Sequence, residues 1–231
     1  MIIGGIQKLS LIDYPGKVAT IVFTKGCIFR CPYCHNPDLV TPKDYKGIPE
    51  GEWWEHLEKR KKFIDGVVVT GGEPTLHPDL PEFIRKVKRY GYLVKLDTNG
   101  ITPGMVRDMI KEKLIDYFAM DIKHTWDNYQ LIANVKPERV ENLKKCHETF
   151  DIIRNSGVPY EWRTTVLPGV HTEDDFVKMA ESFIPGEQYY LQAINYKVTL
   201  SKDLNRSVTL DVGKIAERLR KTYPELLVNT R

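Results

Sequence analysis

Three cysteines stand close together in the sequence with the spacing Cys-x3-Cys-x2-Cys, as Cys27, Cys31 and Cys34. They come directly after the apolar run 18–23, which predicts a buried strand. An iron–sulfur cube takes four thiolate ligands, one for each iron. Three thiolates from one short loop leave one iron open, and an open metal position is where chemistry takes place. The triplet therefore predicts a [4Fe–4S] cluster with one iron free to bind a small molecule.

The alternative for this loop is a structural zinc site completed by His35 or Cys146. Structural zinc ligands usually come as two separated pairs, whereas these cysteines form a single triplet. His35 directly follows Cys34, which is an awkward position from which to close a tetrahedron. Cys146 lies on the helical stripe Leu143, Cys146, Phe150 and Ile153, so we expect it to be a small buried hydrophobe. The cluster interpretation is favoured on the spacing alone.

Polar motifs follow the next two predicted strands. Gly71 and Gly72 let the backbone approach a ligand closely, and Glu73 can accept a hydrogen bond from an ammonium group. A pair of glycines after a strand is, by itself, usually just a turn. Asp97 and Asn99, with Thr98 between them, can bind ribose hydroxyls or simply form an Asx turn before the next helix.

Charged residues also occur inside the later predicted strands. Asp121 and Lys123 are two residues apart, so they point to the same face of a strand and can form an ion pair. Arg163 stands in an otherwise apolar strand and needs an anionic partner, either Asp121 or the carboxylate of a ligand. Gln192 and Asn195 end the last predicted strand.

The elements that must position these residues alternate along the chain. Short β-branched or aromatic runs predict six strands, at 18–23, 67–70, 92–96, 117–122, 160–167 and 188–194. Amphipathic patterns predict helices at 52–63, 80–90, 103–113 (with Thr102 as N-cap), 137–156, 172–183 and 212–223. This alternation predicts an α/β fold, an incomplete (β/α)6 barrel whose site lies at the carboxyl ends of its strands. All the polar motifs fall at or near that end.

The ends of the chain extend this barrel. Residues 1–17 contain Asp13-Tyr14-Pro15-Gly16, whose Pro-Gly pair suits a type II turn, so we expect a hairpin or clasp beside the first strand. The barrel core is assigned to 18–195 and a C-terminal extension to 196–231, with an irregular loop at 196–211 and a last strand within 225–230. The whole of 1–231 is predicted to be a single domain.

Composition narrows the class of partner. The chain has 231 residues, 42% of them hydrophobic, and a formal net charge of +3, which is too balanced to indicate a nucleic-acid or membrane partner. No apolar run is long enough to span a bilayer, and the N-terminus lacks the pattern of a signal peptide. Four cysteines without a targeting signal are typical of a reducing interior, so we expect a cytoplasmic protein.

These residues carry a family resemblance. Cys27-x3-Cys31-x-Tyr33-Cys34 together with Gly71-Gly72-Glu73-Pro74 resembles the radical S-adenosylmethionine (SAM) superfamily. Within it, the runs 96–100, 120–123 and 163–169 are similar to those of pyruvate formate-lyase activating enzyme. The runs 7–17 and 34–37 are similar to those of anaerobic ribonucleoside-triphosphate reductase activating proteins. Where the pyruvate formate-lyase activator has a SAM-contacting histidine near the end of strand six, this chain has Asn195.

The resemblance implies a role for each matched residue. The three cysteines would ligate the cluster, and SAM would chelate the fourth iron. The amino group of SAM would be held by Gly71, Gly72 and Glu73, while Lys123 and Arg163 would face its carboxylate or a neighbouring charge. Asp97 and Asn99 would lie near the ribose or an ion, and Tyr33 near the adenine.

The same resemblance implies an activity and partners. A reduced cluster would split SAM into methionine and a 5′-deoxyadenosyl radical, which would take a hydrogen atom from a glycine of a glycyl-radical enzyme. The expected partner is an anaerobic ribonucleotide reductase, and the expected electron donor is a flavodoxin or ferredoxin. Two alternatives stay open: a radical SAM enzyme acting on a small molecule or peptide, and a non-catalytic metal-binding or electron-carrier module. The run 10–17 argues against the first, and the polar strand-end cluster against the second.

Overall fold

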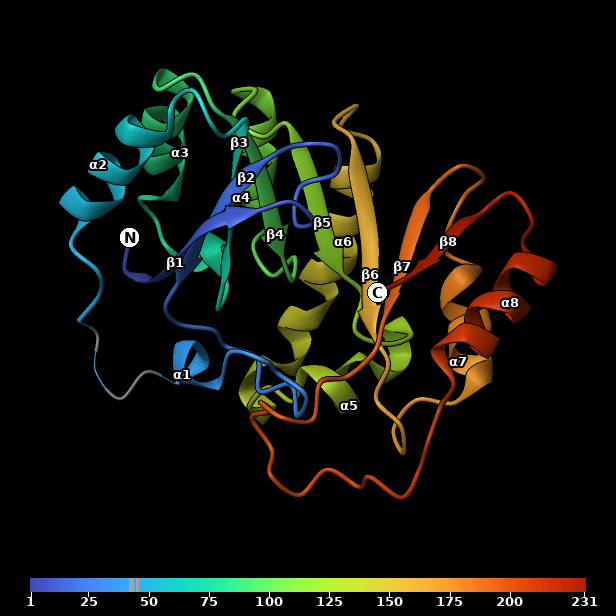
Figure 1. Ribbon diagram of the computed structural model, residues 1–231. Helices are drawn as coiled ribbons and strands as arrows, with labels where there is room; N and C mark the ends of the chain where they lie inside the picture. The colour runs from blue at the N-terminus through green and yellow to red at the C-terminus, as the bar shows by residue number, and fades with distance from the viewer. Residues whose placement is uncertain (42–43, 45) are drawn as a thin grey trace.

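Eight strands form one sheet in the computed structural model, which describes residues 1–41, 44 and 46–231 (Figure 1). The strands follow one another across the sheet in chain order, from β1 at one edge to β8 at the other. Their bounds are β1 Ile3–Ser10, β2 Ala19–Thr24, β3 Gly66–Gly71, β4 Leu93–Thr98, β5 Tyr117–Asp121, β6 Tyr160–Thr165, β7 Gln188–Gln192 and β8 Leu227–Thr230. Since β1 and β8 are edges and do not pair in this order, the barrel is not closed.

Helices connect the strands. The α-helices are α1 Pro37–Val40, α2 Glu50–Arg60, α3 Leu80–Arg89, α4 Pro103–Lys111, α5 Tyr129–Ala133, α6 Lys144–Arg154, α7 Glu173–Ala180 and α8 Val212–Thr222. Three 3-10 helices join them, at η1 Pro74–Leu76, η2 Trp126–Asn128 and η3 Pro137–Leu143. In Figure 1, α1, α5 and the segment between β7 and α8 gather at the lower edge of the view, beyond one end of the strands.

The predicted incomplete α/β barrel is confirmed. Strands β2 to β8 pair in parallel, and each of the six predicted strands is found with its ends displaced by at most two residues. Strand β3 is apolar because both of its faces are covered. In β3, Val67, Val68 and Val69 are all fully buried, which suits β-branched side chains on a parallel sheet. The C-terminal strand expected within 225–230 is β8, paired with β7.

The N-terminal segment forms the expected hairpin. Strand β1 runs antiparallel to β2, and the Lys17 N–H donates to the Tyr14 carbonyl at 3.1 Å, closing the Pro15–Gly16 turn. Gly16 has φ +67°, a left-handed conformation that the third position of a type II turn requires. Tyr14 is buried at the sheet, with its ring 6.0 Å from that of Tyr117. The hairpin is therefore anchored to the barrel through Tyr14.

Two helix predictions need correction. The helix expected over 137–156 begins as the 3-10 helix η3 and becomes α-helical only at α6. Thr102 stands at the N-cap of α4, but its hydroxyl makes no capping bond and is buried without a partner among the described residues. Thr172, by contrast, caps α7 in a reciprocal capping box with Asp175. Residue type alone places a cap but does not orient its hydroxyl.

No helix in the described part of the chain is long and apolar enough to cross a membrane. The hydrophobic core instead lies between the sheet and its covering helices, where Trp53, Phe150 and Trp162 are almost wholly buried. Cys146 is also fully buried there, as its helical stripe predicts. The opposite, inner face of the sheet is much more polar, and the predicted site is built on that face.

Candidate active site

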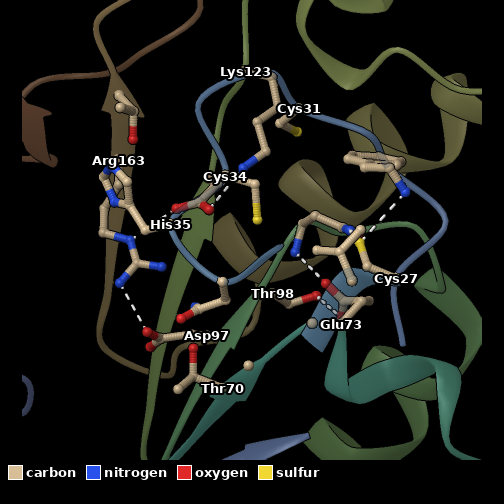
Figure 2. Close-up of a pocket in the computed structure, with 18 of the residues that line it drawn as sticks. Cys27, Cys31, Cys34, His35, Thr70, Glu73, Asp97, Thr98, Lys123 and Arg163 are labelled. Carbon is tan, nitrogen blue, oxygen red and sulfur yellow. Dashed lines mark hydrogen bonds and ion pairs between the residues drawn. The ribbon is translucent and has the colours of Figure 1, made fainter. Parts of the chain in front are cut away.

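The predicted site residues line one cavity of about 320 Å³, shown in Figure 2. They come from the loops after β2 and β3 and from the carboxyl ends of β4, β5 and β6. The predicted residues among its lining are Cys27, Cys31, Tyr33, Cys34, Gly71, Gly72, Glu73, Asp97, Asn99, Lys123 and Arg163. Its volume lies in the range of small-molecule sites. The rule that barrel sites form at the carboxyl ends of strands therefore brings together motifs from five strands.

The glycine pair holds the cysteine loop. The Gly72 N–H donates to the Thr24 carbonyl and the Glu73 N–H to the Gly26 carbonyl, both at 2.8 Å. A Cβ atom on Gly72 would lie 2.1 Å from the Gly26 carbonyl oxygen, and Gly71 has φ +122°. The glycines are thus required by the close approach of two protein segments. The sequence suggested close approach to a ligand, whereas in the fold the immediate neighbour is the cysteine loop itself.

The cysteine loop is fastened from several sides. The Arg30 N–H donates to the Ala133 carbonyl of α5 at 2.9 Å, and the Arg30 guanidinium donates to the Cys27 carbonyl at 2.7 Å. The Ser201 N–H donates to the Pro32 carbonyl at 2.9 Å, which joins the loop to the segment after β7. These contacts fix the loop's backbone through partners distant in the sequence.

The donor set fits an iron–sulfur cluster. All four cysteines are free thiols, and the Cys27 sulfur accepts hydrogen bonds from the Phe29 N–H at 3.4 Å and the Asn99 amide at 3.7 Å. Hydrogen bonds to sulfur stabilise thiolate ligands of such clusters. Burial raises the pKa of Cys27 to about 12 and that of Cys31 to about 11. Both therefore stay protonated at neutral pH unless a metal displaces the protons.

Of the two residues proposed to complete a zinc site, Cys146 lies outside the cavity, whereas His35 lines it. Cys146 is buried in the helix-side core and does not line the cavity. The His35 Nε2 accepts a hydrogen bond from the Asn195 N–H at 3.1 Å. Within residues 1–41, 44 and 46–231, no three His, Cys, Asp or Glu side chains converge to hold a single metal ion. Cysteines of a cube bind different irons, so they do not need to converge on one point.

The Glu73 carboxylate is almost fully buried and already engaged. It accepts hydrogen bonds from the Thr75 N–H at 3.1 Å, the Thr75 hydroxyl at 2.6 Å, the Thr98 hydroxyl at 2.8 Å and the Asn99 N–H at 2.7 Å. Burial raises its pKa, although these donors oppose the rise. The sequence suggested an acceptor for an ammonium group. In the fold this carboxylate lines the cavity and also ties the end of β4 to the loop after β3.

Arg163 finds two anionic partners. Its Nε donates to Asp121 Oδ1 and its Nη1 to Asp97 Oδ2, each at 2.9 Å. Lys123 donates to the other oxygen of Asp121 at 2.8 Å, so the pair predicted on one strand face is present. Burial alone would raise the pKa values of Asp97 and Asp121. The neighbouring cations outweigh burial and hold both values below normal, so both carboxylates are charged at neutral pH.

Other predicted residues lie around this centre. Tyr33 is buried, with the Lys123 ammonium 5.8 Å from its ring centroid. Gln192 lines the cavity, whereas Asn195 is exposed and is not among its lining residues. The Asn195 N–H instead contacts His35, so this position serves the loop contact described above.

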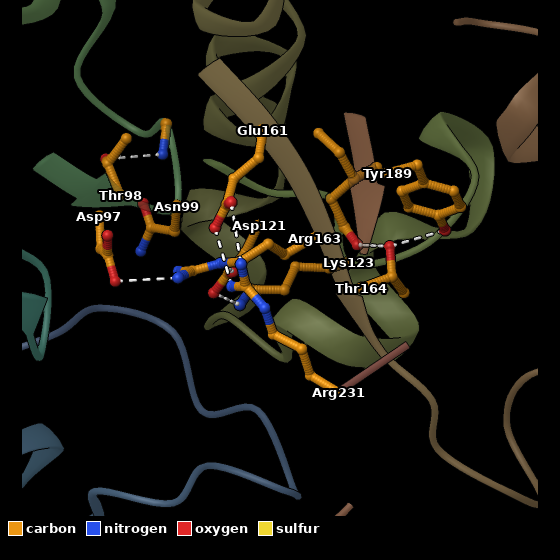
Figure 3. A network of polar contacts seen from close by, with 12 residues as sticks. Asp97, Thr98, Asn99, Asp121, Lys123, Glu161, Arg163, Thr164, Tyr189 and Arg231 are labelled. Atoms are coloured by element: carbon orange, nitrogen blue, oxygen red, sulfur yellow. Dashed lines mark hydrogen bonds and ion pairs between the residues drawn. The ribbon is translucent and has the colours of Figure 1, made fainter. Parts of the chain in front are cut away.

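Four relevant residues were missed at the level of sequence. Asp13 of the hairpin lines the cavity. Lys95, Glu161 and Arg231 do not line the cavity but extend its charged network. Glu161 and Arg231 are labelled in Figure 3. A signal was present, because Lys95 and Asp97, like Glu161 and Arg163, are opposite charges two residues apart on one predicted strand. The contact of Arg231 could not be found this way, since it depends on where β8 joins the sheet.

Fold and site together define a class of enzyme: an open parallel α/β barrel with a three-cysteine loop beside a charged cavity. The family model described as "Radical SAM superfamily" matches residues 21–183, and the chain belongs to this superfamily. It is accordingly a radical SAM enzyme, an oxidoreductase that uses a [4Fe–4S] cluster and SAM.

Similar curated proteins agree with the resemblance to activating enzymes. The chain is 33% identical to a putative glycyl-radical enzyme activating enzyme of Methanocaldococcus jannaschii, covering 94% of this chain and 92% of that protein. It is 29% identical to a pyruvate formate-lyase-activating enzyme of Clostridium pasteurianum, covering 97% of this chain and 98% of that protein.

Among solved structures, the fold resembles that of SuiB from Streptococcus suis bound to S-adenosylmethionine. The TM-score is 0.66 at 16% identity, and the match covers 91% of this chain and 51% of SuiB. The chain therefore spans about half the length of that protein. At this identity the likeness supports the fold of the barrel.

We predict that the cluster depends on the loop cysteines and not on Cys146. Cys31→Ala removes one ligand from the cavity, so anaerobically reconstituted protein should lose most of its iron, sulfide and visible absorbance. Cys146→Ala removes only a buried thiol from the core and should keep the iron content of the wild type. Iron lost on Cys146→Ala in a folded protein would show that Cys146 is a ligand.

A second prediction concerns His171, which ties the loop after β6 to the site. Its Nδ1 accepts from the Leu167 N–H and its Nε2 donates to the Lys123 carbonyl, both at 2.9 Å. Burial, followed by the nearby His124, lowers its pKa from 6.5 to about 4. The unfolded chain then binds more protons below pH 6.5, so the free energy of unfolding should fall by about 3 kcal/mol between pH 6.5 and 4.

Chemical denaturation of wild type and His171→Gln across this pH range measures that contribution as a difference. Gln retains one donor and one acceptor but does not titrate, so the variant should lose less stability on acidification. Identical slopes for the two proteins would exclude His171 as the titrating group.

Proposed function

We propose that this protein is an activating enzyme that generates a glycyl radical on a partner protein, and that the partner is an anaerobic ribonucleotide reductase. The observation that carries the proposal is the convergence of the cysteine loop and the charged strand ends on one cavity. An electron carrier needs no such polar pocket, whereas an enzyme that binds SAM beside its cluster does. The two similar activating enzymes support the activating role.

The arrangement of the cavity suggests which residues bind the cluster and which bind SAM. Cys27, Cys31 and Cys34 would bind three irons of the cluster. The SAM amino group would be held at Gly71, Gly72 and Glu73, which line the cavity. The Glu73 carboxylate also braces this loop through the hydrogen bonds that it accepts. These assignments put the amino group next to the cysteine loop, to which the glycines are bonded.

The remaining groups would orient the rest of SAM. Lys123 and Arg163 supply positive charge for its carboxylate, and both keep their charge because Asp121 raises their pKa values against the effect of burial. Asp97 and Asn99 would lie near the ribose, and Tyr33 near the adenine. The network holds these side chains in place before SAM binds, which lowers the entropy cost of orienting it.

When bound, the cluster and SAM supply reductive cleavage to methionine and a 5′-deoxyadenosyl radical, which takes a hydrogen atom from glycine. The protein's part is to position these groups and keep water away from them. We propose a flavodoxin or ferredoxin as electron donor and the cytoplasm as the working compartment, since free thiols at an iron site require a reducing setting.

The N-terminal hairpin offers a contact for the partner beside the cavity. Leu11 and Ile12 are 70% and 79% exposed and precede Asp13, which lines the cavity. The Ser10 hydroxyl binds Asp13 and accepts from the Ile12 and Asp13 N–H groups at 3.2 Å, so the loop is held in shape. Exposed apolar residues in a fixed loop next to a site are typical of a protein-binding surface.

The activity is tested with anaerobically reconstituted protein, dithionite, SAM and the anaerobic reductase. We expect 5′-deoxyadenosine, and a glycyl doublet in the EPR spectrum only when the reductase is present. Cys31→Ala serves as the control without a cluster. No 5′-deoxyadenosine from fully loaded, reduced protein would contradict SAM cleavage. Cleavage without a glycyl signal would contradict the partner and favour a small-molecule or peptide substrate.

The hairpin gives a prediction that separates partner binding from SAM cleavage. The double variant Leu11→Ser/Ile12→Ser should reduce the yield of glycyl radical at limiting reductase at least fivefold, because apolar contact area is lost. Uncoupled formation of 5′-deoxyadenosine should stay within twofold of the wild type.

Ile184→Ser is the matched control, since Ile184 is also exposed, at 48%, but lies on the segment between α7 and β7. It should activate the reductase normally. An equal loss for both variants, or no loss for the hairpin variant, would exclude the hairpin as the specific contact.

A further inference from the structure

Seven charged residues at the cavity and behind it form one row of alternating sign, and all of them except Lys95 are labelled in Figure 3. The row runs Arg231, Glu161, Lys95, Asp97, Arg163, Asp121, Lys123. It begins at Arg231, after the last strand, and ends at Lys123, which lines the cavity.

Lys95 occupies the middle of this row and is only 1% exposed. Its ammonium lies 2.6 Å from Asp97 Oδ1 and 3.9 Å from Glu161 Oε1. Glu161 is itself fully buried, and its two carboxylate oxygens accept hydrogen bonds from the two terminal nitrogens of Arg231, at 3.0 and 3.2 Å. Lys95 does not line the cavity, so any role in the reaction must act through its neighbours.

The hydrogen bonds of Arg163 indicate how Lys95 affects the position of the guanidinium. A guanidinium usually binds one carboxylate with two parallel hydrogen bonds. Arg163 instead gives one hydrogen bond to Asp97 and one to Asp121. This division follows because Lys95 takes the other oxygen of Asp97, just as Lys123 takes the other oxygen of Asp121. With both outer oxygens occupied, the guanidinium is held between the two strands.

We propose that Lys95 is a positioning residue, a built-in counter-ion that keeps Asp97 monodentate and thereby centres Arg163 for the carboxylate of SAM. This inference rests on the proposed SAM site and deepens it. Without the Lys95 charge, Asp97 is free to turn and chelate Arg163 through both oxygens, drawing the guanidinium away from Asp121. Glu161 would at the same time lose a neighbouring cation in a fully buried position.

The test compares SAM binding by wild type, Lys95→Met and Lys95→Arg, all with a full cluster and no reductant, by anaerobic equilibrium dialysis. Lys95→Met keeps the length and apolar stem of the side chain but removes its charge. We expect its Kd for SAM to rise at least tenfold with unchanged iron content, and Lys95→Arg to recover most of the affinity.

Lys88→Met is the matched control, because Lys88 also binds an aspartate, with its ammonium 2.7 Å from Asp116, but on the outer helix α3. It should bind SAM like the wild type. Equal losses of SAM affinity in the two methionine variants would contradict a role specific to Lys95.

Chemical rescue adds a readout that a purely structural role would not move. Lys95→Ala leaves space for a small cation, so added ethylammonium should restore SAM affinity in this variant and leave the wild type unchanged. Failure of ethylammonium to restore affinity in folded Lys95→Ala would contradict the counter-ion role. If Lys95→Ala does not fold, the comparison of Lys95→Met with Lys95→Arg decides.

The outcomes separate this inference from the proposed function. Wild-type protein that binds its cluster but not SAM would overturn the proposed SAM site together with the role of Lys95. Wild-type binding with an unchanged Kd in Lys95→Met would overturn the role of Lys95 alone. SAM binding and its rescue by ethylammonium are both measured without the partner protein. A wrong partner assignment would therefore change neither result.

Discussion

The structure depends on the pairing of buried charges across the inner face of an open barrel. An isolated charge in such a place is very costly, and each must therefore find a partner of opposite sign. Asp97, Arg163 and Asp121 meet this requirement from three adjacent strands. The partners restrain one another, so the side chains that face the cavity are held in place by residues that do not reach it. The ion pairs that offset the cost of burying these charges also orient the side chains that would bind a charged ligand.

A second dependence links the glycine motif to the cysteine motif. Backbone hydrogen bonds from Gly72 and Glu73 run to the strand end and loop that carry the cysteines, and a side chain on Gly72 would strike Gly26. Changes in either motif must therefore disturb the other. The cluster loop, the proposed SAM amino site and the end of β4 are parts of one hydrogen-bonded unit, joined by the buried Glu73 carboxylate.

Much of this arrangement could be predicted from the sequence, because parallel strands place their carboxyl ends together. The sequence predicts Asp121 as one of two partners for Arg163, and this ion pair is present, whereas the bond of Arg163 to Asp97 was not predicted. The orientation of single groups did not follow. Glu73 lines the cavity but also accepts hydrogen bonds from the end of β4, and the Thr102 hydroxyl does not cap its helix. The orientation of such groups depends on competing local contacts of similar energy. Residue type alone does not tell which of these contacts is the most stable.

The sequence by itself determined the class of this protein. The cysteine spacing, the strand–helix alternation and the placement of polar residues after strands are all local patterns. Each involves residues close together in the sequence, so each can be recognised without the fold. Only the tertiary structure decided how the charges share their partners. That Lys95 and Lys123 each take one carboxylate oxygen, and leave Arg163 to bridge two strands, depends on register between strands. The contact of Arg231 with Glu161 depends on where the last strand joins the sheet. These two residues are far apart in the sequence, so no local pattern predicts that they meet.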